Sequence, residues 1–153
     1  MTRRGLTIMT TMLLHKDILI PDWANKKAMA TLKGYKSYRL SNHAIEHASK
    51  DADRSHGYTL DGLRDALNNA IGKWFEPFEV ELTKVGPSWE VTKVCIRVPY
   101  SKGQDACLAI RTSKMDRSQA FVVTAWLNST KDPHTTLDAT KYATKEDVEA
   151  ISK

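Results

Sequence analysis

The chain has 153 residues, with 23 Lys or Arg against 18 Asp or Glu, so its net charge at pH 7 is +5. A hydrophobic fraction of 41% with 7 Gly and 5 Pro excludes collagen-like, low-complexity and disordered chains, and the apolar runs are too short for a membrane helix. The length fits one domain, and the positive charge is compatible with a polyanionic partner.

The N-terminus imitates a signal peptide, because Arg3 and Arg4 precede a mostly apolar run. Charged residues follow at once at positions 15–17, and no small-x-small cleavage site is present. We therefore interpret this segment as a first strand or a loosely packed lead-in. The two cysteines, Cys95 and Cys107, match no metal-ligand or redox spacing, which favours reduced thiols and a cytoplasmic protein. Because no apolar run is long enough for a membrane helix, we expect no membrane partner.

The segment from residue 23 to residue 44 concentrates positive charge and contains no acid. Its cations are Lys26, Lys27, Lys33, Lys36 and Arg39. They form either an ordinary solvated face or an arm that contacts phosphates. We divide the chain into a basic N-terminal segment, residues 1–37, and a single α+β domain, residues 38–153. The first segment is either part of that domain or a loosely packed arm.

Three helices are predicted from capping residues and apolar spacing. Ser41 is a good N-cap for a helix over residues 42–49, and Thr59 for a second helix over residues 60–71. The apolar residues of the second helix recur at helical spacing. A short helix over residues 145–151 follows near the C-terminus.

After Pro77 the hydrophobic period changes from 3.6 to 2. Four alternating runs, at residues 78–82, 94–98, 106–110 and 121–127, are separated by short turns, which is typical of an antiparallel meander. We therefore predict an α+β fold in which N-terminal helices pack on one face of a four-stranded antiparallel sheet.

Alternation also predicts which side chains share a face of this sheet. The apolar face comprises Phe78, Val80, Leu82, Val94, Ile96, Val98, Leu108, Ile110, Phe121, Val123 and Leu127. The opposite face comprises Lys93, Arg97, Arg111, Thr124, Trp126 and Asn128. Cations, hydrogen-bonding groups and an aromatic ring can together neutralise phosphates and stack a base, although an ordinary wet sheet face is the alternative. A register error of one residue would invert a strand's assignment.

The first predicted helix contains the pattern H-x-x-E-H, from His43 to His47. The i, i+4 spacing places both rings on one helical face, where they could share a zinc ion. Because no clear third ligand accompanies them, we assign no metal and no other cofactor. A surface histidine pair without a function is the alternative.

A second group of candidate residues follows the last predicted strand. Metal-independent RNA cleavage needs a base for the 2′-OH proton, an acid for the 5′-oxygen and cations for the charged phosphorane. Histidine suits the two proton transfers, and Arg or Lys suits the phosphate. The candidate catalytic residues are His43, His47, Arg111, Lys114, His134, Thr136 and Tyr142.

The order of these features resembles the toxin ribonuclease superfamily, which includes barnase-like, EndoU-like, colicin-type and RelE-like domains. The resemblance covers residues 38–142: a Ser-x-His-Ala-x-x-His helix, a second helix, four strands, then FVVTAWLNSTKDPHTTLD and a Tyr. It implies a role for a His in the early helix and for basic, Thr or Tyr groups in the last strands. The matching residues are His43, Arg111, Lys114, Thr124, Trp126, His134 and Tyr142. The long basic segment before the helix departs from compact toxins.

Two functions follow as hypotheses. The first is a small metal-independent ribonuclease, such as a toxin or phage effector, which would act on RNA (tRNA is one candidate) and could have an antitoxin or immunity partner. The second is a non-catalytic module that uses the same basic face to bind nucleic acid or a host protein. Convergence of the early histidines with Arg111 and His134 would favour the enzyme.

Overall fold

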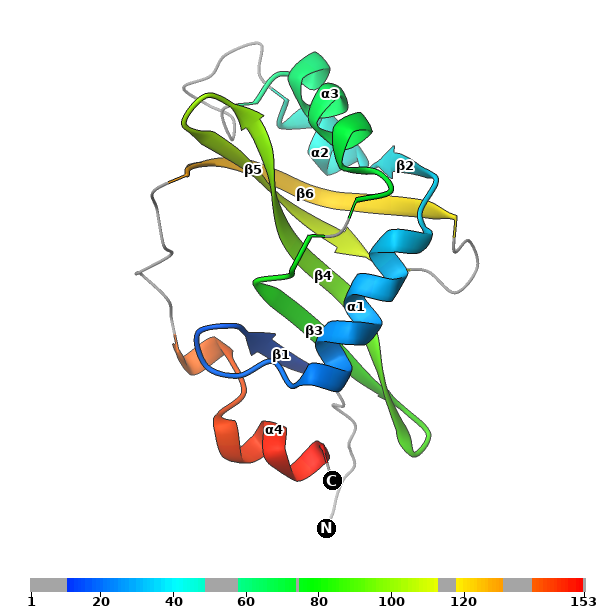
Figure 1. Ribbon diagram of the computed structural model, residues 1–153, viewed down its shortest axis with the longest axis vertical. Coiled ribbons are helices and arrows are strands. Elements are labelled where there is room, and N and C mark those ends of the chain that lie inside the picture. Colours follow the sequence, from blue (N-terminus) through cyan, green and yellow to red (C-terminus); the bar gives the residue numbers. More distant parts are fainter. Residues whose placement is uncertain (1–10, 49–57, 74, 113–117, 131–138, 153) are drawn as a thin grey trace.

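The computed structural model describes residues 11–48, 58–73, 75–112, 118–130 and 139–152. Within these ranges the chain forms an α+β fold with a six-stranded mixed sheet (Figure 1). The strands are β1 (Thr11–His15), β2 (Ser37–Leu40), β3 (Glu79–Val85), β4 (Ser88–Ser101), β5 (Gln104–Arg111) and β6 (Gln119–Ser129). The helices are α1 (Asp22–Gly34), α2 (Asn42–Glu46), α3 (Leu60–Ala70), α4 (Lys145–Ile151) and the 3₁₀ helix η2 (Ala139–Lys141).

The predicted meander is present as β3 to β6, but two further strands flank it. The strand order is β1-β3-β4-β5-β6-β2. β1 pairs antiparallel with β3, whereas β2 pairs parallel with β6. The prediction of four antiparallel strands was therefore incomplete. β2 is only four residues long and pairs with a strand about eighty positions later, so its local sequence carries no signal of that pairing.

The basic segment forms α1, which packs on the sheet. Pro21 precedes the helix, where its fixed φ is compatible with a helical start. Ala24, Ala28 and Leu32 recur every four residues and are buried in the main core. The side chain of Trp23 donates a hydrogen bond to Ser152, 2.9 Å away. Residues 22–34 thus supply part of the hydrophobic core.

The predicted caps of the other helices are confirmed. The Ser41 and Thr59 side chains accept hydrogen bonds from the backbone N–H groups of Ala44 and Gly62, each at 3.0 Å. α4 covers the predicted residues 145–151 and begins with a capping box at Thr144. α2 is shorter than predicted, because it ends at Glu46. Among the helices of the described ranges, none combines the length and apolar character needed to cross a bilayer.

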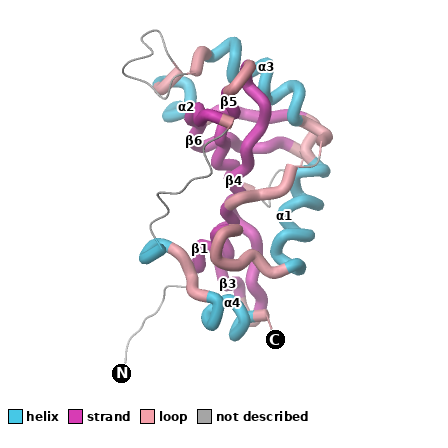
Figure 2. The backbone as a smooth tube through the Cα atoms, turned by 60° about the vertical axis from the view of Figure 1, so that its left-hand side comes forward, coloured by secondary structure: helices cyan, strands magenta, loops and turns pink. Residues whose placement is uncertain are grey.

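The face of the sheet that packs against α1 and α3 is the one that alternation predicts for β3, β4 and β5. Its buried side chains include Val80, Leu82, Val94, Ile96, Val98, Leu108 and Ile110. Figure 2 shows both helices on the same side of the strands. We call the opposite side of the sheet the polar face.

The predicted alternation fails in the middle of β6 because that strand contains a β-bulge. Ala109 pairs with Thr124, whereas the next residue of β5, Ile110, pairs with Val122. Val123 is therefore an extra residue, and the alternation shifts by one position on the two sides of it.

The bulge corrects the assignment of part of the apolar face. Ala120 is buried in the main core, and Phe121 lies on the polar face, opposite to the prediction. Beyond the bulge, Leu127 packs against the main core, as predicted. Phe78 was also assigned to the wrong side, because it belongs to a second, small cluster under Trp126. The bulge thus adds an aromatic ring to the polar face.

Candidate nucleic-acid interface

Four side chains from four neighbouring strands form a row across the polar face. Phe121 of β6 pairs with Arg39 of β2 on one side and with Arg111 of β5 on the other. Arg111 in turn pairs with Lys93 of β4. Directly paired residues project to the same face of a sheet, so these side chains are neighbours. We call Arg39, Phe121, Arg111 and Lys93 the basic row.

The two arginines of the basic row are exposed and available to a ligand. Cζ of Arg39 lies 4.1 Å from the centroid of the half-buried Phe121 ring, well inside cation–π range. Arg111 forms no ion pair with any residue in the described part of the chain. The third cation, Lys93, lies 3.9 Å from the carboxylate of Glu81. The accessible positive charge of the basic row therefore comes from its two arginines.

Elsewhere the polar face is more balanced in charge than the sequence prediction implied. Arg97 forms an ion pair with Asp105 at 3.2 Å and donates a hydrogen bond to the Ser129 carbonyl at 2.7 Å. Glu79 and Glu81 also lie on this face, since they alternate with the core residues of β3. The same alternation that placed the cations could have placed these acids. Arg97 is thus held within the protein, in contrast to the arginines of the basic row.

Thr124, Trp126 and Asn128 continue along β6 on the polar face. Each pairs with a β5 residue of that face, and all three are half-buried. Trp126 packs on a small cluster of Phe78, Cys95, Cys107 and Ala109. The Trp126 and Phe78 rings meet edge to face, with centroids 6.5 Å apart. A second aromatic ring with neighbouring hydrogen-bonding groups therefore lies on the same strand as Phe121.

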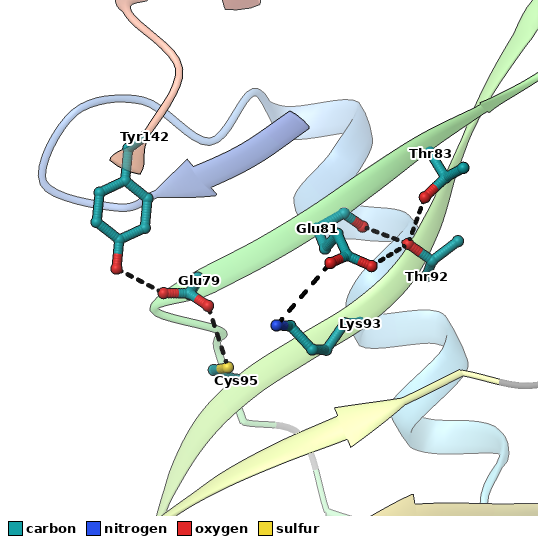
Figure 3. A network of polar contacts seen from close by, with 7 residues as sticks. All are labelled: Glu79, Glu81, Thr83, Thr92, Lys93, Cys95 and Tyr142. Carbon is teal, nitrogen blue, oxygen red and sulfur yellow. Dashed lines mark hydrogen bonds and ion pairs between the residues drawn. The ribbon is translucent and has the colours of Figure 1, made fainter. Parts of the chain in front are cut away.

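Tyr142 contacts the polar face towards the β1 edge of the sheet, away from β2, in a network centred on Glu79 (Figure 3). Its hydroxyl donates to one oxygen of Glu79 at 2.6 Å, and the Cys95 thiol donates to the other at 3.4 Å. Burial, followed by the nearby Glu79 charge, raises the pKa of the Cys95 thiol. The thiol therefore stays protonated and is a poor nucleophile.

The contacts of Tyr142 indicate a structural role. Its ring packs edge-on against His15, with centroids 5.0 Å apart, and the backbone N–H of Ala143 donates to the Leu13 carbonyl. Burial lowers the pKa of His15, which is 2% exposed, so this histidine is neutral at pH 7. These contacts attach the segment before α4 to β1 and β3. From β3 to β6 is three strand spacings, or about 14 Å, which separates Tyr142 from α2.

The helix that carries the histidine pair, α2, lies at the β2 edge of the sheet, where the basic row begins. The Ser41 hydroxyl donates to the Val123 carbonyl at 2.6 Å, so α2 starts beside the bulge of β6. The rings of His43 and His47 have centroids 4.2 Å apart. In the described ranges no group of three or more His, Cys, Asp or Glu side chains could hold a metal ion. The pair therefore has no described third ligand.

The remaining predicted residues do not join this interface. α1, which packs on the face opposite to the polar face, holds Lys26, Lys27 and Lys33. The Lys27 amine lies over the Trp23 ring, 5.6 Å from its centroid. Lys36 is exposed just before β2. The predicted catalytic residues Lys114, His134 and Thr136 lie outside the described residues. One continuous interface thus cannot contain both the α1 lysines and the basic row.

A cavity on the helical side offers little room for a small substrate. It lies between α1, α3 and the sheet, and its volume is about 20 Å³, on the scale of a single water molecule. Its lining is mostly apolar and includes Tyr35, whose hydroxyl has no hydrogen-bond partner among the described residues. Burial raises the pKa of this tyrosine to about 12. Nothing in this lining suggests acid–base chemistry at pH 7.

Comparisons of the chain with protein families, curated proteins and solved structures found no match. The functional proposals therefore rest on the chemistry and placement of this chain's own residues.

Proposed function

We propose that this protein binds RNA through the basic row on the polar face of its sheet. The observation that carries the proposal is the alignment of Arg39, Phe121 and Arg111 on three neighbouring strands, with both guanidinium groups exposed. Guanidinium groups bind phosphate oxygens with charge-assisted hydrogen bonds. The Phe121 ring lies beneath the Arg39 guanidinium and orients it, and a planar group of this kind is suited to the bases that lie between phosphates.

The surroundings of the basic row support the same proposal. Arg97 and Lys93 have acidic neighbours within the protein, whereas Arg111 has no such partner in the described part of the chain. A cation that is paired with an acid of the same protein has little charge left to attract a ligand. An exposed arginine that lacks such an acid is available to an external anion. Thr124 and Asn128 add hydroxyl and amide groups that can bind ribose or base edges.

The proposal is tested by titrating a fluorescently labelled single-stranded RNA with the protein at several salt concentrations. Each neutralised phosphate of a single strand contributes about −0.7 to the slope of log K against log salt, so two exposed arginines predict a slope of about −1.4. Fluorescence anisotropy measures both affinity and slope. Failure to bind at low salt, or binding that is independent of salt, would reject the proposal.

A metal-independent ribonuclease is a second candidate, and the location of the histidine pair favours it. α2 begins beside β6 and directly after β2, the strand that holds Arg39. An RNA on the basic row would therefore bind at the edge of the sheet from which the histidine helix starts, and an imidazole is the side chain best suited to proton transfer. Tyr142 is not part of this candidate active site, because its hydroxyl is bound to Glu79 on β3, far from the β2 edge of the sheet.

The ribonuclease candidate predicts cleavage of total tRNA that EDTA does not stop. His43→Ala should then lower the cleavage rate by about 10²–10⁴-fold, the usual contribution of a general acid or base. Glu46→Ala is the matched control, because Glu46 is exposed on the same helix and has no imidazole. Gel analysis between about pH 5 and 8 covers the range in which histidine titrates. Undiminished cleavage by His43→Ala would exclude its role, and binding without cleavage would leave RNA binding as the function.

A further inference from the structure

We infer that the ligand of the basic row is single-stranded, and that one of its bases stacks on the guanidinium of Arg39. The inference rests on the proposed RNA-binding function and adds to it the form of the RNA and the role of one residue. Its starting point is the contact between Arg39 and Phe121.

The Arg39 guanidinium covers the Phe121 ring on the solvent side. Arg39 is exposed, Phe121 is half-buried, and Cζ of the arginine lies 4.1 Å from the ring centroid. A base that approaches from solvent therefore meets the guanidinium before the ring. Guanidinium planes stack on bases as aromatic rings do, and the contact with Phe121 holds this one in place beforehand. Arg39 and Phe121 together form a stacking platform.

The surface that carries the basic row is a broad sheet face. The basic row crosses the strands, so Arg39 and Arg111 are separated by two strand spacings, or about 10 Å. Both belong to one face of a six-stranded sheet, which is too broad to enter a duplex groove as a helix or a two-stranded ribbon does. In a duplex the bases are stacked on one another and cannot reach the platform. A single strand can lay its backbone along the arginines and turn a base towards Arg39.

The polar face carries a second aromatic ring near the basic row. Trp126 lies on the same strand as Phe121, with Thr124 between them, and it is half-buried. Single-strand binding sites typically combine cations that follow the backbone with several stacking side chains. The basic row with Trp126 provides both. Because every base has a flat face, such a site should tolerate different sequences.

The test separates stacking from charge at Arg39. Arg39→Lys keeps the positive charge but removes the planar guanidinium, so we expect affinity for a labelled single-stranded RNA octamer to fall about tenfold. The salt slope should stay the same, because the number of cations is unchanged. Arg111→Lys is the matched control: a lysine still binds a phosphate as a point charge, so we expect the same exchange at Arg111 to lower affinity clearly less than it does at Arg39. Circular dichroism confirms that both variants fold like the wild type.

A duplex of the same octamer completes the experiment. We expect the wild-type protein to bind the duplex at least about tenfold more weakly than the single strand. Equal affinity for both forms would overturn the inference but not RNA binding itself. Wild-type affinity of Arg39→Lys for the single strand would overturn the role of stacking. Absence of binding to either form would instead reject the proposed function.

Discussion

The double variant Arg39→Glu, Arg111→Glu should lose RNA affinity by about two to four orders of magnitude at low salt. Each substitution removes a charge-assisted contact of about 1.5–3 kcal/mol and places an anion where a phosphate would bind. The remaining cation of the basic row, Lys93, lies beside Glu81 and cannot compensate for the loss. Anisotropy titration against the wild type measures the effect, and the salt slope should fall towards zero.

The control for this prediction is the double variant Lys84→Glu, Lys102→Glu. Both lysines are exposed and lie outside the basic row, near the two hairpin turns of β3–β4 and β4–β5. The net charge changes by the same amount as in the arginine variant. A similar loss of affinity in both variants would show that overall charge, rather than the basic row, governs binding, and would contradict the proposed interface.

Ala28→Asp should destabilise the fold by about 3–5 kcal/mol, the usual consequence of an uncompensated buried charge. Ala28 is fully buried between α1 and the sheet, in the main core. A loss of this size is a large fraction of the stability of an ordinary domain. Urea unfolding followed by circular dichroism measures it as a lower midpoint.

Ala30→Asp provides the matched control on the same helix. Ala30 is exposed, so the substitution introduces the same charge into solvent and costs only the lower helix propensity of Asp, about 0.7 kcal/mol or less. If both variants unfolded at the same urea concentration, α1 would not be packed on the sheet. The basic segment would then be a detached arm, which was one of the two interpretations of the sequence.

The helix in the basic segment was not predicted, although the sequence contains a signal for it. Ala24, Ala28 and Leu32 follow Pro21 at regular spacing, which is a weak but genuine helix signal. Lys26, Lys27 and Lys33 lie in the same segment and give it a strongly polar composition. Alanine has a small side chain, so the apolar stripe of this helix is a weak hydrophobic signal. The same small side chains allow the helix to approach the sheet closely.

The candidate site was predicted in part and for a clear reason. Lys93, Arg97 and Arg111 lie on the predicted face, since β4 and β5 pair without interruption from Lys93 to Pro99. The acids that neutralise Arg97 and Lys93 obey the same alternation. Phe121 was assigned to the other face, because nothing in the local sequence reveals the extra residue at Val123. The aromatic residue of the basic row was thus missed.

The sequence alone determined the features that depend on neighbours along the chain. These are the caps at Ser41 and Thr59, the short last helix and the alternation of β3 to β5, since capping and alternation act within a few residues. Only the tertiary structure decided that β2 pairs with β6 and that a bulge turns Phe121 towards Arg39. It likewise separated Tyr142 from the histidine helix. Pairing between distant strands depends on packing across the whole sheet, and local sequence does not encode it.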